Sequence, residues 1–267
     1  MSSFDAERGV MILEPEQWDV LQRMVTGPVA QRANYAQGVL VGLEDIGVID
    51  PYGPTLAASE VLAGLMAADA RYSLRRMDPK DPVPVRDIVF WLSSPRCTVE
   101  RYDADGVHVY GCDDVEVAHI ALANDHLYPR PMVDDGPDDI YDTLAAAVRL
   151  ADVRAAEANM ATIGYGGPRA SQFVQDARDG RWTIVLHSRE DRDRDQGFVL
   201  TDQLMTLGVS TMVYVIGEDD SPVGDPNGPG RGIPLIPVSA TEVWGHLSSW
   251  MWAPTKPAPD RSEAGYP

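Results

Sequence analysis

Three stretches near the start of the chain carry apolar residues at the three- and four-residue spacing of a helix face. They lie at 14–25, within 28–47 and at 55–66, where Pro15 suits a first helical turn and Gly47 suits the position after a helix. We therefore expect three helices in this region. Their apolar positions are Trp18, Leu21 and Val25, then Val39, Leu40, Leu43 and Ile46, then Leu56, Val61, Leu62, Leu65 and Met66.

Runs of β-branched and aromatic residues follow these helices and recur in the second half of the chain, and they predict strands. The predicted strands are 88–92, 181–188, 209–216 and 233–238. Prolines in the last run suit an edge strand. Residues 78–84 are predicted to be a linker, and the alternating Arg and Asp residues of 188–197 a solvated loop.

Three helices are expected in the second half. Residues 138–160 have a helical apolar period, and a shorter helix is predicted to start at Pro168. The last begins at Ser239, whose hydroxyl and the Glu242 carboxylate have capping-box spacing. Its apolar face contains Val243, Leu247, Trp250 and Met251.

Residues 97–102 and 107–112 flank an Asp-Gly pair and predict a β-hairpin. A tight two-residue loop would put Cys97 directly opposite Cys112. A bulge at Gly106 would instead place the two cysteines on opposite faces and gather three valines on one face. The cleaner apolar face favours the bulge, and we expect two thiols rather than a disulfide.

The stretch 217–232, GEDDSPVGDPNGPGRG, contains glycines and acids that invite a ligand-binding interpretation. No Lys or hydroxyl residue follows its glycines as a phosphate-binding loop requires. Its acids also miss the spacing of a calcium-binding EF-hand loop. We interpret it as a connection between two strands, with an irregular cation site at Asp219, Asp220 and Asp225 as the alternative.

The two halves of the chain share an order of elements, helices followed by adjoining strands and a return to helix. This order predicts an α+β fold with one central antiparallel β-sheet and a helical bundle on each side, in which the two halves form a pseudo-repeat of elements. The expected organisation is one domain over 1–252, with pseudo-halves at 11–130 and 136–252. A Pro-rich tail without apolar periodicity, 253–267, is expected to be disordered.

Composition narrows the classes of partner. The chain has 267 residues, and its 41 acidic against 22 basic residues give a net charge of −19. Such a charge argues against nucleic acid and against an anionic membrane surface. The absence of a long apolar run argues against a membrane span, and the polar N-terminus indicates a cytoplasmic protein.

Motifs for catalysis are absent: the sequence has no GxSxG, HExxH or CxxC pattern. His119 and His126 lack further ligands at suitable spacing. We therefore predict that the chain is not an enzyme and holds neither cofactor nor metal. The alternatives are an enzyme with a scattered site, for which His108, Cys112 and Asp113 are the best candidates, and an immunity-type or structural binding protein.

The last helix is rich in large side chains, with Trp244, Trp250, Met251 and Trp252 within nine residues. One helical face buries about two of them, so the remainder indicates a protein-contact surface. The alternative, that all belong to the core, is equally compatible with the sequence.

Several segments resemble the EspG family of type VII (ESX) secretion chaperones. They are ATIGYGGPRASQFVQDARDGRWTIVLHS at 161–188, MVYVIGED at 212–219, IPLIPVSATEVWGHL at 233–247, LEPEQWDVL at 13–21 and LEDIGVI at 43–49. The similarity spans roughly 11–252 and contains no catalytic motif.

This resemblance implies a central antiparallel sheet flanked by two helical bundles with quasi-twofold symmetry. It also implies a cytosolic, non-enzymatic chaperone that binds the hydrophobic helical tip of a PPE protein in a PE–PPE heterodimer. The family's binding face lies on the sheet and the C-terminal bundle, which points here to two strands and the last helix. The residues expected to contact the partner are Trp182, Ile184, Met212, Tyr214, Trp244, Leu247, Trp250 and Met251.

Overall fold

The computed structural model describes residues 2–27, 35–78, 81–93, 95–112, 179, 183–193, 197–208, 213–216, 235–238 and 240–252. Within these ranges, ten strands form one sheet in the order β1-β2-β8-β7-β6-β5-β9-β10-β11-β12, and every neighbouring pair is antiparallel. The prediction of an α+β fold around a central antiparallel sheet is therefore confirmed.

The strands of this sheet are β1 (Ser3–Asp5), β2 (Val10–Leu13), β5 (Ala70–Asp78), β6 (Asp81–Ser93), β7 (Arg96–Asp103), β8 (Gly106–Cys112), β9 (Thr183–Asp193), β10 (Gly197–Gly208), β11 (Val213–Ile216) and β12 (Leu235–Val238). Two short strands, β3 (Ile49–Asp50) and β4 (Gly53–Pro54), pair separately. The helices are α1 (Pro15–Thr26), α2 (Gln37–Asp45), α3 (Leu56–Val61), α4 (Ala63–Met66) and α8 (Ala240–Trp252).

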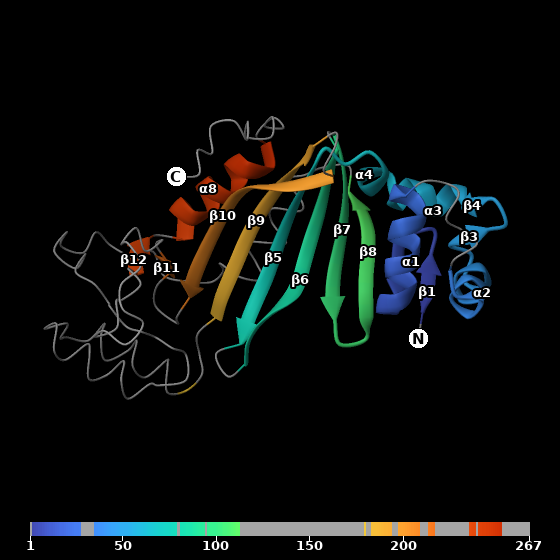
Figure 1. Ribbon diagram of the computed structural model, residues 1–267, viewed down its shortest axis with the longest axis horizontal. Coiled ribbons are helices and arrows are strands. Elements are labelled where there is room, and N and C mark those ends of the chain that lie inside the picture. The colour runs from blue at the N-terminus through green and yellow to red at the C-terminus, as the bar shows by residue number, and fades with distance from the viewer. Residues whose placement is uncertain are drawn as a thin grey trace, which may run out of the picture.

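Strands from the first half of the chain occupy one side of the sheet and strands from the second half the other (Figure 1). The two sets meet where β5 pairs with β9, from Ala70 opposite Asp191 to Met77 opposite Ile184. Both expected pseudo-halves therefore contribute to a single sheet. The two helical bundles and the quasi-twofold repeat stay predictions.

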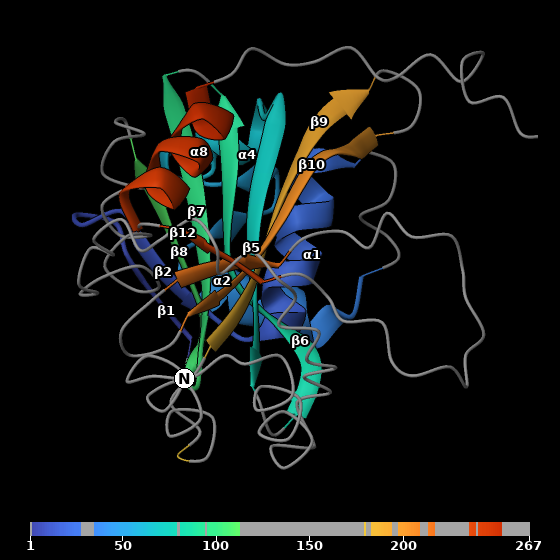
Figure 2. The same cartoon turned by 90° about the vertical axis from the view of Figure 1, so that its left-hand side faces the viewer.

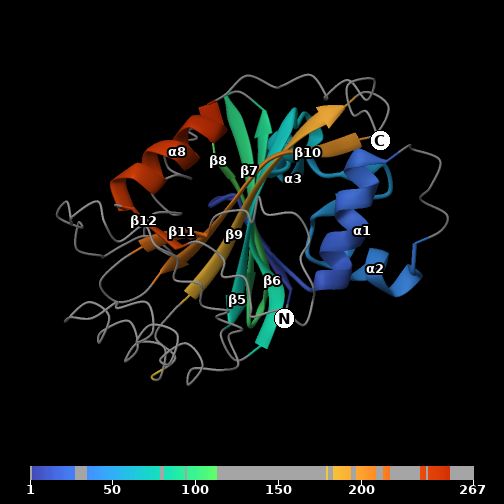
Figure 3. The same cartoon turned by 60° about the vertical axis from the view of Figure 1, so that its left-hand side comes forward.

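Helices cover both faces of the sheet, and each face has its own apolar core. Figures 2 and 3 show α8 on one face and α1 and α2 on the other. Consecutive residues of β6 alternate between the cores: Phe90 packs beneath α8, and Val89 and Trp91 pack against the N-terminal helices. Because successive side chains of a strand point to opposite faces, a strand covered on both sides reads as a continuous apolar run.

Local sequence signals mark the start of α1, the end of α2 and the start of α3, whereas the single helix expected over 55–66 is divided into α3 and α4. The backbone N–H of Glu14 donates to Gln17 Oε1 (3.0 Å) at the start of α1, and Pro15 occupies the first turn. Gly47 follows α2 with a φ of 75°, a conformation that glycine adopts without steric cost. Thr55 Oγ1 accepts from the N–H of Ala58 (3.4 Å) and caps α3.

Two predicted loops are strands. The linker was expected over 78–84; within it, Asp78 ends β5 and 81–84 begin β6, and Asp78 pairs with Asp81. Residues 188–193, expected to be a solvated loop, continue β9 and pair with β10. In β9, Arg189 and Asp191 form a buried ion pair. The alternation of Arg and Asp in the sequence indicates solvent-exposed charges and does not predict this pair.

The register of the β7–β8 hairpin also differs from the prediction. Asp103 pairs with Gly106 around a two-residue turn, and Cys97 lies directly opposite Cys112. Val99 therefore belongs to one core, and Val107 and Val109 belong to the other. We expected the bulge because it would place the three valines on one face. The hairpin is instead apolar on both faces, because both faces of the sheet are covered by helices.

Several expectations fall outside the described residues. They are the helices at 138–160 and from Pro168, His119 and His126, the stretch 217–232 and the tail 253–267. The strands that flank 217–232 do pair, with Val213 opposite Val238 and Ile216 opposite Leu235. Across the part of the chain that the structure describes, no helix has both the length and the apolar character needed to cross a bilayer.

Candidate interaction surface

Helix α8 lies on one face of the sheet (Figures 2 and 3) and is held there by its apolar face. Val243, Leu247 and Trp250 recur at four- and three-residue spacing and are at most 7% exposed. They pack with sheet residues such as Tyr72 and Phe90 in one core. The predicted apolar face of this helix is thus confirmed at these three positions.

A buried polar network lies beneath α8 on the same face. Hydrogen bonds join Tyr72 Oη to His187 Nδ1 (2.7 Å) and His187 Nε2 to Thr206 Oγ1 (3.1 Å). Burial raises the pKa of Tyr72 well above its ordinary value, which keeps its hydroxyl protonated. The Tyr72 ring also packs edge-on against Trp250, with centroids 6.3 Å apart. The network fixes side chains of β5, β9 and β10 relative to the helix above them.

Arg189 connects β9 to the last turn of α8. Its guanidinium donates to Asp191 Oδ1 through Nε (2.9 Å) and through a terminal nitrogen (2.7 Å), and it also donates to the carbonyl oxygen of Trp250. Arg189 and Asp191 are 1% and 2% exposed. The last carbonyls of a helix have no intrahelical partner, so this contact satisfies one of them with a cation at the favourable end of the helix dipole.

The residues predicted to contact a partner have different environments. Ile184, Leu247 and Trp250 are buried within the protein's own fold, whereas Trp244 is only partly buried and packs at the margin of the core. Trp182 and Met212 lie outside the described residues, as do the side chains of Tyr214 and Met251. The structure therefore brings Trp244, Leu247 and Trp250 together on α8 and assigns the last two to helix packing.

The outer face of α8 is mainly small and polar. Thr241, Glu242, Gly245, His246 and Ser249 are exposed along it. The His246 ring packs edge-on against Trp250, with centroids 5.0 Å apart. Trp244 borders this face and is, among the described side chains of α8, the large apolar one that is only partly buried.

The sequence did not predict the buried polar residues that hold α8 in place. Tyr72 belongs to β5, a strand that the pattern did not predict, and Arg189 and Asp191 were taken for a loop. A signal for β5 does exist, since Ala70, Tyr72 and Leu74 alternate with Arg71, Ser73 and Arg75. No comparable signal distinguishes the buried pair in β9 from its solvated neighbours.

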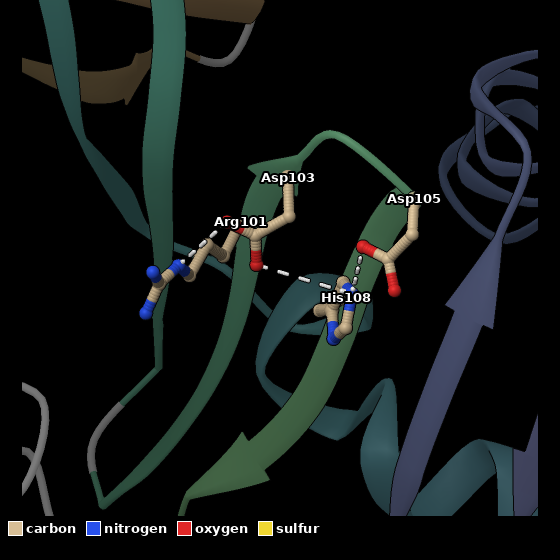
Figure 4. Close-up of polar contacts among 4 residues, drawn as sticks. All are labelled: Arg101, Asp103, Asp105 and His108. Atoms are coloured by element: carbon tan, nitrogen blue, oxygen red, sulfur yellow. Dashed lines mark hydrogen bonds and ion pairs between the residues drawn. The ribbon is translucent and has the colours of Figure 1, made fainter.

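A second polar cluster lies at the tip of the β7–β8 hairpin (Figure 4). His108 Nε2 donates to Asp105 Oδ1 (2.8 Å) and lies 3.9 Å from Asp103 Oδ2, while Arg101 Nε donates to Asp103 Oδ1 (3.1 Å). The ligand atoms of Asp103, Asp105 and His108 lie within 4.8 Å of one another, but both carboxylates are exposed. With the arginine already neutralising one acid, the cluster is accounted for as a set of contacts that closes the turn.

The hydrogen bond from His108 lowers the pKa of Asp105. A carboxyl group whose pKa is lower in the folded than in the unfolded protein stabilises the fold fully at pH values above its unfolded pKa of about 3.9. This stabilisation is lost as the pH falls through the lower pKa of the folded protein. We expect His108→Ala to return the Asp105 titration towards that ordinary value, as followed by carboxyl-carbon NMR. His246→Ala, which removes an exposed histidine elsewhere, should leave it unchanged; equal Asp105 titrations in the His108→Ala variant and the parent would contradict this assignment.

The residues of the enzyme alternative are not brought together. His108 and Cys112 share one face of β8 but lie at its two ends, with Tyr110 between them. Asp113 lies outside the described residues. Of the three candidate residues, the two that the structure describes therefore do not form a nucleophile and base at hydrogen-bonding distance.

A small depression lies on the opposite face of the sheet, where Arg71 is the central residue. Its guanidinium lies over the rings of Trp91 (5.5 Å) and Phe198 (5.2 Å), and its Nε donates to Glu190 (2.5 Å). The depression has room for no more than about one water molecule, far less than the ~300–1,000 Å³ typical of small-molecule sites. Its arginine is engaged in structural contacts rather than presented to a ligand.

Comparison with solved structures relates the whole fold to a secretion chaperone. The chain is similar to a chain in the structure of the Mycobacterium tuberculosis type VII secretion system chaperone EspG5 in complex with a PE25–PPE41 dimer, with a TM-score of 0.54 and 10% sequence identity. The match covers 94% of this chain and 98% of the other. No protein-family model and no curated protein matches the sequence. At this identity the similarity establishes a shared fold.

Proposed function

We propose that this protein is a non-enzymatic, cytoplasmic chaperone of type VII secretion that binds a PE–PPE-like helical heterodimer through its hydrophobic tip. The observation that carries the proposal is the fold similarity to EspG5, which extends over nearly the full length of both chains. The segment-by-segment resemblance to the same family in the sequence supports it independently. So does the absence of a catalytic motif from the sequence.

The proposed contact surface is the exposed side of α8 together with the neighbouring strands β9 and β11. Trp244 supplies a large apolar side chain there, flanked by exposed polar residues such as Glu242 and His246. An aromatic anchor inside a polar rim is the usual composition of a protein-binding patch. The net charge of −19 would orient the partner and keep the chaperone soluble, with the apolar contact supplying most of the affinity.

The proposal is tested by co-expressing the protein with candidate PE–PPE heterodimers and resolving the products by size-exclusion chromatography. We expect a stoichiometric complex with a cognate pair. Trp244→Ala should weaken it by at least about tenfold, because truncating an aromatic anchor at an interface costs about 2 kcal/mol or more. Binding is measured by titration calorimetry on the purified components.

Two variants serve as controls for this experiment. Leu56→Ala removes an apolar side chain that is 81% exposed on α3, in the other half of the molecule, and should leave affinity unchanged. Trp250→Ala is unsuitable as an interface probe, since Trp250 is 7% exposed and its loss disturbs helix packing. A folded protein that binds no cognate pair would refute the proposed function, and a complex insensitive to Trp244→Ala would refute this surface.

A further inference from the structure

The hairpin register brings the two cysteines of the chain together. Cys97 of β7 lies directly opposite Cys112 of β8, and both are thiols in the structure. Directly opposed residues of antiparallel strands have Cα atoms about 4.5–5.5 Å apart and side chains on the same face. A disulfide requires a Cα separation of about 4.4–6.8 Å. The Cα separation expected for this pair therefore lies within the range that a disulfide spans.

The two thiols differ in accessibility. Cys97 is 1% exposed and belongs to the core beneath α8, whereas Cys112 is partly exposed and packs against the margin of the same core. Burial, and secondarily the proximity of Cys112, raise the pKa of Cys97, which keeps it protonated. We therefore expect an external reagent to react first with Cys112, which has Cys97 beside it on the neighbouring strand.

The opposite face of the hairpin is held firmly at this end. Thr98 Oγ1 donates to the carbonyl of Val61 (2.8 Å) and accepts from the N–H of Leu65 (3.0 Å), which ties β7 to α3 and α4. A Cβ added to Gly64 would lie 2.2 Å from the backbone nitrogen of Thr98, so α4 rests directly on the strand backbone. This packing fixes the position of β7 next to the cysteine pair and opposes a slip of register.

We propose that Cys97 and Cys112 form a thiol–disulfide exchange site whose co-substrate is a low-molecular-weight disulfide and whose product is a cross-strand disulfide. The Cys112 thiolate attacks one sulfur of the small disulfide and releases one small thiol, giving a mixed disulfide on Cys112. Cys97 then loses its proton, attacks the Cys112 sulfur and releases the second small thiol. Two protein thiols are oxidised, and one external disulfide is reduced to two thiols that carry the two protons.

The bond would join the start of β7 to the end of β8 and lock the hairpin at the end opposite its turn. Cytosolic disulfides of this kind are typically transient and redox-sensing rather than structural. The inference rests on the register and burial of this hairpin and is independent of the proposed chaperone function.

The experiment exposes the purified, folded full chain to mixtures of reduced and oxidised glutathione, followed by acid quenching, thiol alkylation and mass spectrometry. As the oxidised fraction rises, we expect both alkylation sites to be lost together. The intact mass should fall by two hydrogen atoms, and a peptide pair linking Cys97 to Cys112 should appear. The thermal midpoint of the oxidised protein should exceed that of the reduced protein, because the closed loop restricts the unfolded chain.

Two variants separate the steps. Cys97→Ser should stop at a glutathione adduct on Cys112, and Cys112→Ser should resist modification while folded, because its remaining thiol is buried. If Cys97→Ser does not fold, Cys112→Ser still tests the order of attack, since rapid modification of Cys97 would contradict it. A folded wild-type protein that keeps both thiols in oxidised glutathione, retains a stable adduct, or forms interchain dimers would overturn the proposal.

Discussion

Asp191→Ala is expected to lower the free energy of unfolding by about 3–5 kcal/mol, the largest effect of any single charge removal considered in this fold. Asp191 is 2% exposed and accepts from two nitrogens of Arg189, itself 1% exposed. Removing the carboxylate takes from a guanidinium buried beneath α8 the anion that accepts two of its hydrogen bonds. The same guanidinium donates to the Trp250 carbonyl, so the last turn of α8 should lose protection against hydrogen exchange.

The adjacent ion pair provides a matched control for this prediction. Arg71 and Glu190 sit one register position from Asp191 on the same two strands, but their side chains point to the other face and are 28% and 14% exposed. Glu190→Ala should cost only about 1 kcal/mol, since partly solvated pairs are screened and the freed arginine can reach water. The free energy of unfolding of both variants is measured by urea titration. Equal decreases in the two variants would show that burial does not determine how much the Arg189–Asp191 pair contributes to stability.

Gly64→Ala is expected to lower the free energy of unfolding by about 3 kcal/mol or more, at the upper end of overpacking effects. The added Cβ would lie 2.2 Å from Thr98 N, 2.5 Å from Cys97 C and 2.8 Å from Cys97 Cα. All three are backbone atoms of a central strand, so relief requires α4 to move off β7. That movement also strains the hydrogen bonds from Thr98 to Val61 and from Leu65 to Thr98.

Gly245→Ala, at an exposed position of α8 where an added Cβ meets nothing within 4 Å, is the control substitution. It should stabilise the protein by about 0.5–1 kcal/mol, because alanine loses less backbone freedom than glycine in a helix interior. The two variants are compared by thermal and urea unfolding. A Gly64→Ala protein as stable as the parent would mean that α4 does not rest on β7 as closely as the structure shows.

Both predictions concern contacts that hold the fold together. The Arg189–Asp191 pair fixes the end of α8, and Gly64 allows the N-terminal helices to approach the sheet beside the cysteine pair. A loss of partner binding in either variant would therefore follow from loss of the fold. For this reason only the partly buried Trp244 is offered as a probe of binding itself.

The sequence by itself was sufficient for the elements whose signals are local. Pro15 marks the start of α1, Gly47 follows the end of α2, and Thr55 caps the start of α3. The spacing of Val243, Leu247 and Trp250 marks the face of α8 that packs on the sheet. These features depend on residues within one or two turns, so they are legible without knowledge of the fold. The family resemblance likewise led to the fold that the comparison with EspG5 supports.

Only the tertiary structure decided which charges are buried, which residues face each other and which tryptophan remains accessible. Arg189 and Asp191 resemble a solvated loop in sequence, and their burial follows from the position of β9 between β5 and β10 beneath α8. The register that opposes Cys97 to Cys112 was missed because the pattern argument assumed one covered face, whereas helices cover both. A local pattern reports only the polarity of each position, while burial and pairing are set by neighbours distant in the chain.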